Sequence, residues 1–197
     1  MLKKLVFISV GFLFCCSFFS YSIAVDTKVK ALMVIAKNDF RDEEYSQPRK
    51  LLEGKGVKVT VASSSLETAK GMLGMKVKPD ILLRDVKVKD YAVVIFVGGI
   101  GSKDYWDNSV CHQIAKDVVA QKKVLGAICL APGILAKAGV LKGRKATGYS
   151  TCKKILIEKG AIWQEDAVVV DGKIITANGP QSAEKFGKTI LKVMKIK

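Results

Sequence analysis

The sequence has few of the residues that usually bind metal ions or serve as a catalytic histidine. Histidine occurs once, as His112, and the chain has no Cys-x-x-Cys pair and no Cys/His spacing suited to zinc. We therefore expect no metal site and no cofactor. His112 follows Cys111 and has polar neighbours at helical spacing, so we expect it at the surface, with a role as a catalytic base as the alternative.

Acidic residues are also scarce, with 18 Asp and Glu against 33 Lys and Arg, which gives a formal net charge of +15. The lysines are scattered, with no run of five or more, and no aromatic residues are interleaved with them. A stacking platform for nucleic acid needs such aromatics, so we predict no specific nucleic-acid partner. We expect a solvated basic surface that can associate with an anionic cell-envelope surface.

The first 24 residues have the pattern of a signal peptide. Lys3 and Lys4 form a basic start, an uncharged apolar stretch follows, and small residues end at Ala24. We predict cleavage after Ala24 and export to the periplasm or outside the cell, which lowers the net charge to +13 because two lysines and no acids are lost. The alternative is a membrane anchor that is not cleaved, because residues 5–25 are 21 uncharged residues.

The remaining chain alternates predicted strands with predicted helices and shows no linker or repeat. Apolar strands are expected at 29–36, 57–62, 91–97 and 124–128, and helices at 42–53, 108–122, 150–159 and 180–194. Residues 37–43 are expected to be a polar turn, 63–90 a loop with a short hairpin around 71–74 and 81–83, and 167–176 a second hairpin. This order predicts one domain over residues 28–197, doubly wound, with a mostly parallel sheet and helices on both faces.

Residues 124–133 hold the most informative pattern in the chain. A run of small and apolar residues stops at Cys129, and Pro132 and Gly133 then open an apolar stretch. A strand that turns sharply into a helix at a cysteine is the pattern of a nucleophile elbow, and a helix N-terminus there favours the thiolate. The alternative is a buried, inert core cysteine.

Unusual residues follow three of the predicted strands, and parallel strands bring their carboxyl ends to one edge. Cys129 follows one strand, Gly98-Gly99 another, and a run of acids the first. Among these acids Glu44 is our candidate partner for the thiol, with Asp42 and Glu43 as rivals, because a carboxyl in an apolar pocket stays protonated and can donate a hydrogen bond. All three are alternatively ordinary helix-start acids.

Two backbone N–H groups are candidates for an oxyanion hole, those of Gly99 and Leu130. The alternative for the glycine pair is a plain strand-to-helix turn. After removal of the signal peptide three cysteines remain, at 111, 129 and 152. An odd number leaves at least one thiol unpaired, and Cys111 and Cys152 could pair.

Four segments together resemble the ThiJ/PfpI superfamily, which has a glutamine-amidotransferase-like fold of flavodoxin type. They are residues 36–44, 97–99, 127–132 and 138–144, and the resemblance covers residues 29–195 in order. It implies Cys129 as elbow nucleophile, Glu44 as its carboxyl partner, the N–H groups of Gly99 and Leu130 as oxyanion hole, and a homodimer or larger assembly.

The resemblance also implies a range of activities, among them deglycase, cofactor-free glyoxalase, peptidase, chaperone and oxidation sensor. We expect a cysteine-dependent enzyme acting on small reactive carbonyls or glycated adducts, with a redox sensor or chaperone as the alternative. A peptidase or amidase is less favoured, since peptidase-like members have His where this chain has Leu130 and Glu where an ungapped match puts Lys103.

Overall fold

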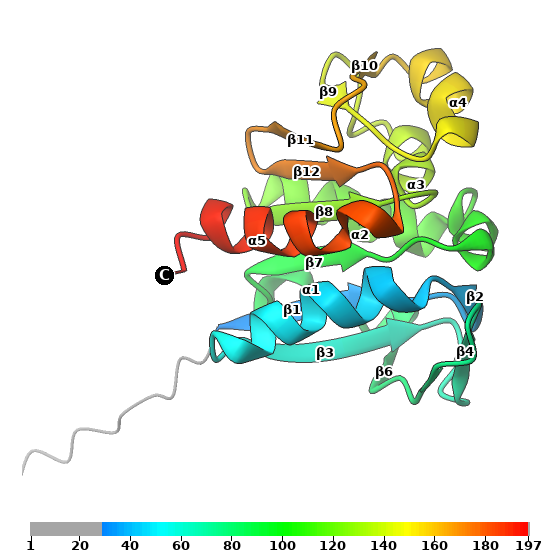
Figure 1. Cartoon of the computed structure of the whole chain (residues 1–197), viewed down its shortest axis with the longest axis vertical. Helices are drawn as coiled ribbons and strands as arrows, with labels where there is room; N and C mark the ends of the chain where they lie inside the picture. The colour runs from blue at the N-terminus through cyan, green and yellow to red at the C-terminus, as the bar shows by residue number, and fades with distance from the viewer. Residues whose placement is uncertain (1–28, 197) are drawn as a thin grey trace, which may run out of the picture.

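The computed structural model describes residues 29–196, and its centre is a seven-stranded sheet (Figure 1). The strand order is β11-β12-β8-β7-β1-β3-β6, and every neighbouring pair is parallel except β11 with β12. The strands are β1 Lys30–Val34, β3 Lys58–Ser63, β6 Ile81–Leu82, β7 Val93–Phe96, β8 Val124–Ile128, β11 Val168–Asp171 and β12 Ile174–Ala177.

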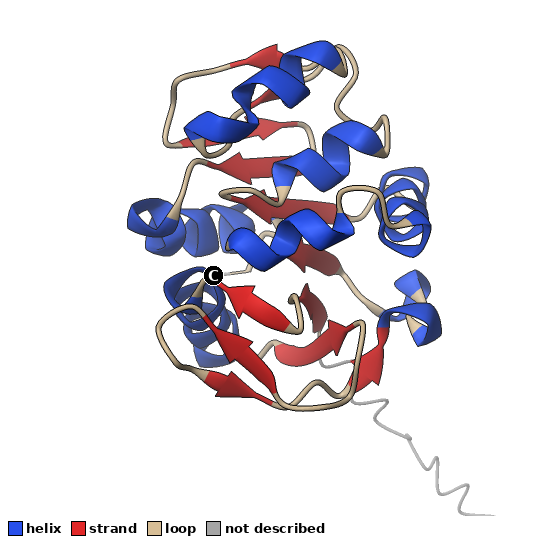
Figure 2. Cartoon of the chain, turned by 90° about the vertical axis from the view of Figure 1, so that its right-hand side faces the viewer, coloured by secondary structure: helices blue, strands red, loops and turns tan. Residues whose placement is uncertain are grey.

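Helices cover both faces of this sheet, as the edge-on view shows (Figure 2). The α-helices are α1 Asp42–Gly54, α2 Ser109–Ala120, α3 Pro132–Lys137, α4 Lys153–Glu158 and α5 Ala183–Val193. Short 3-10 turns are η1 Leu83–Asp85, η2 Val88–Asp90, η3 Ile100–Tyr105, η4 Ser150–Cys152 and η5 Pro180–Ser182. Helices α1 and α5 pack together on one face, and α2 packs with α3 on the other (Figure 1).

The doubly wound α/β fold with a mostly parallel sheet is therefore confirmed. From β1 the chain passes to β3 on one side and then returns to β7, β8 and β12 on the other. The switch point lies between β1 and β7, and in such sheets a crevice opens there at the carboxyl ends of the strands.

Two small sheets flank the main one. Strand β2 Asn38–Phe40 pairs with β4 Ala69–Gly71, which forms a hairpin with β5 Lys76–Val77, while β9 Lys145–Ala146 pairs with β10 Ile162–Trp163. The hairpin around 71–74 and the hairpin at 167–176 are confirmed. The prediction of a plain turn at 37–43 was wrong, because β2 lies there. Residues 81–82 belong to the edge of the main sheet rather than to a hairpin.

Close packing beneath the site depends on two glycines, one in the sheet and one in a helix that covers it. A Cβ at Gly126 of β8 would lie 2.9 Å from the ring of Phe186, and one at Gly187 of α5 would lie 3.0 Å from the Cα of Pro48. Pro48 lies inside α1, in its second turn, where it lacks the N–H of a regular helix residue. The bare Gly187 lets α1 and α5 approach closely, which fixes the helix that carries Glu44.

The N-terminal segment and the cysteine pairing were also predicted from the sequence. The predicted signal peptide, residues 1–24, lies outside the described residues. Within residues 29–196 no helix is both long enough and apolar enough to cross a bilayer. Cys111 and Cys152 are buried and unpaired here, and the Cys152 thiol instead donates to the carbonyl oxygens of Tyr149 (3.2 Å) and Cys129 (3.3 Å).

Candidate active site

Cys129 follows β8 directly and has a strained backbone. Its φ is +62°, in the left-handed region that residues other than glycine rarely adopt. The surrounding chain holds this conformation: the Cys129 N–H donates to Ala177 O (2.9 Å), and Cys129 O accepts from the N–H of Tyr149 (2.7 Å). Strain of this kind is concentrated at functional sites, and the strand-turn-helix geometry is that of a nucleophile elbow.

The glycine pair after β7 provides the space in which the thiol and the acid meet. A Cβ on Gly98 would lie 2.4 Å from Glu44 Oε2 and 2.6 Å from the Cβ of Cys129, so any side chain there would displace both. Gly99 has φ +97°, and a Cβ there would lie 2.3 Å from Asp39 O. Both positions therefore require glycine for close approach, which a plain turn would not.

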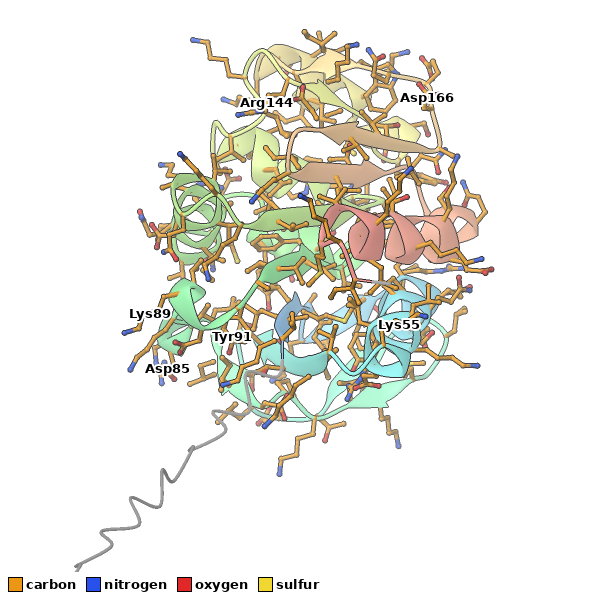
Figure 3. The ribbon with its side chains drawn as sticks, turned by 90° about the vertical axis from the view of Figure 1, so that its left-hand side faces the viewer. Lys55, Asp85, Lys89, Tyr91, Arg144 and Asp166 are labelled. Carbon is orange, nitrogen blue, oxygen red and sulfur yellow. The ribbon has the colours of Figure 1, made fainter. Side chains whose placement is uncertain are left out.

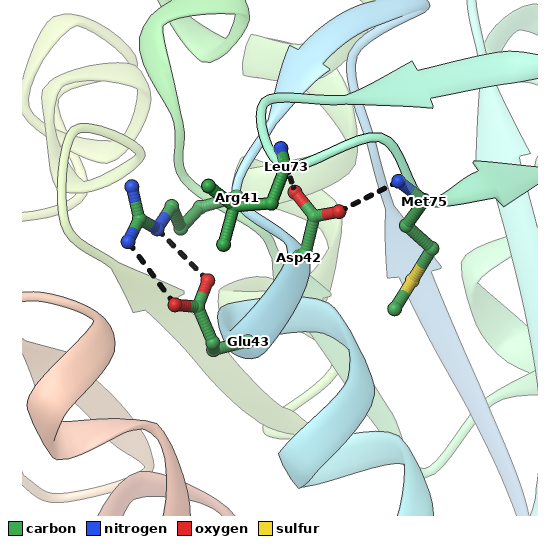
Figure 4. Close-up of polar contacts among 5 residues, drawn as sticks. All are labelled: Arg41, Asp42, Glu43, Leu73 and Met75. Atoms are coloured by element: carbon green, nitrogen blue, oxygen red, sulfur yellow. Dashed lines mark hydrogen bonds and ion pairs between the residues drawn. The ribbon is translucent and has the colours of Figure 1, made fainter.

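The three consecutive acids at the start of α1 have three different environments. Asp42 accepts the N–H groups of Leu73 (2.9 Å) and Met75 (2.8 Å), so it anchors the tip of the β4–β5 hairpin (Figure 4). Glu43 forms a double ion pair with Arg41, with Nε–Oε2 at 2.8 Å and Nη2–Oε1 at 3.1 Å. Only the third, Glu44, faces the thiol, so the two rivals are already engaged elsewhere.

Glu44 is fully buried, and neither of its carboxyl oxygens has a hydrogen-bond partner in good geometry among the described residues. Burial raises the pKa of this carboxyl from 4.5 to about 8, although the Cys129 thiol, the Arg41 guanidinium and the Gly98 N–H lie near enough to oppose the shift. At neutral pH the acid therefore keeps its proton.

The pKa of the Cys129 thiol depends on more than the helix N-terminus beside it. Burial, followed by the negative charge of an ionised Glu44, raises the pKa of Cys129 to about 12, while the N–H groups of Gly99 and Leu130 lower it. Burial and the charge of Glu44 therefore oppose the preference for the thiolate that the helix N-terminus provides. The thiol and the acid titrate as one coupled pair.

A cavity of about 410 Å³ opens over this pair. The side chain of Cys129 is only 7% exposed, yet it lines the cavity and can be reached from it. The lining residues are Arg41, Glu44, Met72, Gly99, Ile100, Cys129, Leu130, Tyr149, Pro180 and Gln181. All four candidate site residues are thus brought together, and their chemical roles stay predictions.

Sequence reasoning missed Arg41, whose guanidinium lines the cavity while paired with Glu43. Arg41 stands in the acid-rich segment after the first strand, and nothing in the sequence pattern there sets it apart. His112 is half-buried and its Nε2 donates to Trp106 O (2.7 Å), and it does not line the cavity over Cys129. Lys103, where peptidase-like members have Glu, has its ammonium 5.9 Å from the centre of the Trp106 ring.

Trp106 also fixes the elbow from behind. Its Nε1 donates to Leu130 O (2.9 Å), and a Cβ on Gly133 would lie 2.3 Å from its ring. Within residues 29–196 no cluster of three or more His, Cys, Asp or Glu side chains could hold a metal ion. The groups that the structure brings together at this site are a thiol, a buried carboxyl and two backbone N–H groups.

These features define a class: flavodoxin-like α/β proteins with a cysteine at a nucleophile elbow and a buried carboxyl beside it. The chain belongs to the DJ-1/PfpI family, whose model matches residues 29–193. The structure of a ThiJ/PfpI domain protein from Brachyspira murdochii superposes with a TM-score of 0.83 at 32% identity, covering 84% of this chain and 96% of the other. The resemblance to the ThiJ/PfpI superfamily is confirmed.

Three relatives show the range of this likeness. An uncharacterised protein of Methanocaldococcus jannaschii is 45% identical, covering 84% of this chain and 82% of its own. A protein of Pyrococcus horikoshii named a deglycase is 30% identical, covering 83% and 99%. A protein of Caenorhabditis elegans named a glutathione-independent glyoxalase is 30% identical, covering 83% and 88%.

Proposed function

We propose that this protein is a cysteine-dependent enzyme that acts on small 2-oxoaldehydes or their glycated adducts, with Cys129 as nucleophile and Glu44 as proton carrier. The single observation that carries the proposal is the Glu44 carboxyl, which is fully buried, lacks a hydrogen-bond partner in good geometry among the described residues, and faces the thiol under an open cavity. Relatives named deglycase and glyoxalase support the same class of substrate.

The reaction begins with addition of the Cys129 sulfur to the aldehyde carbon of the substrate. A carbon–sulfur bond forms, the carbonyl π bond breaks, and the oxygen of the hemithioacetal lies against the N–H groups of Gly99 and Leu130. The proton released by the thiol passes to that oxygen through Glu44. A residue with a pKa of about 8 can accept and return a proton near neutral pH.

Glu44 then moves a proton between the two carbons of the adduct. It removes the proton on the former aldehyde carbon while the keto oxygen gains a proton, which gives an enediol. It then delivers a proton to the former keto carbon while the hemithioacetal hydroxyl loses its own, and the product is a thioester of a 2-hydroxy acid. Water cleaves the carbon–sulfur bond and restores the thiol. For methylglyoxal the sum is one water consumed and one lactate formed, with no outside oxidant or reductant.

The pH dependence follows from the coupled pair. The reactive form has lost one of the two protons shared by Cys129 and Glu44, and the first loss is governed by the lower pKa, which burial sets at about 8. We expect kcat/KM to rise with pH and to level off above about pH 8.

The test is to incubate the chain from Val25 onward with methylglyoxal and to follow lactate. Production in excess of a Cys129→Ala control supports the proposal, and no excess rejects it. Thr189→Val, a surface substitution on α5, is the matched control for the general effect of a substitution.

A second candidate is a redox sensor, and the same unpartnered carboxyl favours it. Two peroxide molecules oxidise the thiol to a sulfinic acid and are themselves reduced to two waters, and a protonated Glu44 can donate a hydrogen bond to the new sulfinate oxygen. Mass spectrometry after mild peroxide treatment distinguishes the candidates: clean addition of two oxygen atoms at Cys129, without turnover of carbonyls, favours the sensor.

Assembly and address are also proposals. We infer a homodimer, which light scattering of the purified chain would test. Export through a signal peptide at residues 1–24, with an anchor that is not cleaved as the alternative, is tested by N-terminal sequencing of the protein recovered from its host. A start at Val25 supports cleavage, and a start at Met1 supports the anchor.

A further inference from the structure

A second, smaller pocket adjoins the cavity over Cys129. It has a volume of about 220 Å³ and shares two lining residues, Tyr149 and Gln181, with that cavity. The remaining lining residues are Thr147, Gly148, Ser150, Trp163, Glu165 and Asn178. The two hollows are therefore neighbours at the same edge of the sheet, and one ligand can extend from the sulfur into both.

Thr147 gives this pocket a reason to hold a ligand. Its side chain is 1% exposed, and its Oγ1 is buried with no hydrogen-bond partner among the described residues. Its backbone N–H is already used, because it donates to Thr176 Oγ1 (2.9 Å). A buried hydroxyl without a protein partner costs free energy, and a hydrogen-bonding group in the pocket would remove that cost.

The charges around the pocket are already neutralised. Glu165 accepts from Lys153 Nζ (2.6 Å) and from Trp163 Nε1 (2.8 Å), and the Lys153 ammonium lies 5.3 Å from the centre of the Trp163 ring. No other charged side chain lines the pocket. A phosphate or a carboxylate would find no free cation there, so the occupant is uncharged.

The remaining groups are hydroxyls, amides and an aromatic ring. Ser150 and Thr147 supply hydroxyls, Asn178 and Gln181 supply amides, and Trp163 supplies the ring. Asn178 Oδ1 already accepts from Ser182 Oγ (2.7 Å) and Gln181 Nε2 (3.4 Å), so Asn178 offers its NH2 group and Gln181 its carbonyl oxygen. Each hydroxyl can donate to or accept from a ligand hydroxyl. This set matches a short chain of hydroxyl-bearing carbons.

We propose that this pocket is a specificity subsite for the polyhydroxylated tail of a sugar-derived 2-oxoaldehyde whose aldehyde carbon lies at Cys129. The inference rests on the proposed function, because it assigns the tail of the substrate of that same site. Methylglyoxal, which has only a methyl group in place of the tail, occupies the cavity over Cys129 and leaves the subsite empty. The structure thus assigns Thr147 to substrate selection rather than to the chemical step.

The experiment compares kcat/KM for methylglyoxal and for 3-deoxyglucosone, a hexose-derived 2-oxoaldehyde, in matched variants. Thr147→Val removes the hydroxyl and keeps the shape, and Ser150→Ala does the same at the exposed lip of the pocket. We expect Thr147→Val to lower kcat/KM for 3-deoxyglucosone about three- to tenfold and to leave methylglyoxal within about twofold. Thr189→Val, whose Oγ1 donates to Lys185 O (2.8 Å) on the surface of α5, should change neither.

Equal effects on both substrates, or no effect on either, would overturn the subsite. If the wild type turns over neither substrate, the proposed function is rejected instead. In that case saturation-transfer NMR on Cys129→Ala protein tests the subsite alone. The subsite is supported if saturation reaches the protons on the hydroxyl-bearing carbons of 3-deoxyglucosone and this transfer is lost in the Cys129→Ala/Thr147→Val double variant. Absence of transfer rejects the subsite.

Discussion

The two edges of the parallel sheet are built by different rules. At the carboxyl edge, three buried side-chain oxygens have no hydrogen-bond partner, and within residues 29–196 these are the only ones of their kind: both oxygens of Glu44 and Oγ1 of Thr147. Asp39 and Cys129 also have positive φ there, at +56° and +62°. Unmet hydrogen bonds and backbone strain are thus gathered around the two hollows.

At the amino edge the polar groups are matched instead. Lys123 Nζ donates to the carbonyl oxygens of Lys89 (2.8 Å) and Tyr91, and Lys173 Nζ donates to Lys122 O (2.6 Å). Lys122 also has a positive φ, +53°, but it follows the end of α2, where such a conformation commonly ends a helix. Figure 3 views this edge, with Lys89 projecting from its rim.

The comparison teaches where this fold can tolerate unsatisfied groups. Lysines at the starts of strands and the ends of helices complete backbone carbonyls, so the amino edge contributes stability. The carboxyl edge gives up hydrogen bonds, and the stability of the rest of the sheet offsets that cost. This division predicts that substitutions at the carboxyl edge change the chemistry. Substitutions at the amino edge should lower the stability slightly and leave the chemistry unchanged.

The largest expected effect is that of Glu44→Gln on turnover. The amide keeps the size of the side chain but cannot carry a proton, so we expect kcat with methylglyoxal to fall by about 10²- to 10⁴-fold. Alkylation of Cys129 by iodoacetamide should persist, since the cavity remains open. Glu53→Gln makes the same change farther along α1 and should leave turnover within about twofold; an equal loss in both would remove Glu44 from the mechanism.

The second-largest expected effect is on the pH dependence of the unfolding free energy, which an acid buried at the carboxyl edge should change. The pKa of Glu44 is raised on folding, from 4.5 to about 8, so folding costs nothing extra below pH 4.5 and becomes costlier as pH rises through about 8. Relative to Glu44→Gln, the wild type should lose up to about 5 kcal/mol of unfolding free energy between pH 4.5 and pH 8. Urea unfolding of both proteins at pH 5 and pH 8 measures this difference.

Glu53→Gln is again the control, because Glu53 lies near the surface and pairs with Arg49 at 2.8 Å. Its unfolding free energy relative to the wild type should change little between the two pH values. A Glu44→Gln variant whose advantage does not grow with pH would show that the acid is ionised in the folded state, contrary to its burial.

The third effect concerns the hairpin that walls the cavity. Asp42→Ala leaves the N–H groups of Leu73 and Met75 without their acceptor, so we expect a loss of about 2–3 kcal/mol of unfolding free energy. Met72 lines the cavity from the same hairpin, so KM should rise more than kcat falls. Asp42→Asn keeps one acceptor oxygen and should lose less; equal losses would argue against the hydrogen bonds as the cause.

Sequence alone could predict the fold because its signals are local. Apolar runs of strand length, the helical pattern at 108–122 and the hairpin pattern at 167–176 each fix a local element. Strand β2 escaped prediction because it is three residues long, its first two residues are polar, and its partner, β4, lies about thirty residues away in the chain. Pairing across such a separation leaves no periodic pattern.

The candidate site was predictable in part for the same reason. Cys129 and Gly98-Gly99 follow strands, and parallel topology brings strand ends together. Which of three consecutive acids faces the thiol depended on the helix phase and on the hairpin that Asp42 anchors, and neither is visible in the sequence. The thiol pKa depended on burial, which outweighs the local helix terminus. Nothing in the sequence indicated Thr147, because its interest lies in a buried hydroxyl without a hydrogen-bond partner among the described residues, which only the structure reveals.

The smallest expected effect is at the amino edge. Lys173→Met removes an exposed donor to Lys122 O while keeping most of the side chain, so we expect a loss of about 0.5 kcal/mol or less in urea unfolding. Turnover of methylglyoxal should stay within about twofold, because Lys173 directly precedes β12 and only the far end of that strand reaches the site. A fall in kcat comparable to that of Asp42→Ala would mean that the two edges are coupled through β12, and the division between a stabilising edge and a chemical edge would fail.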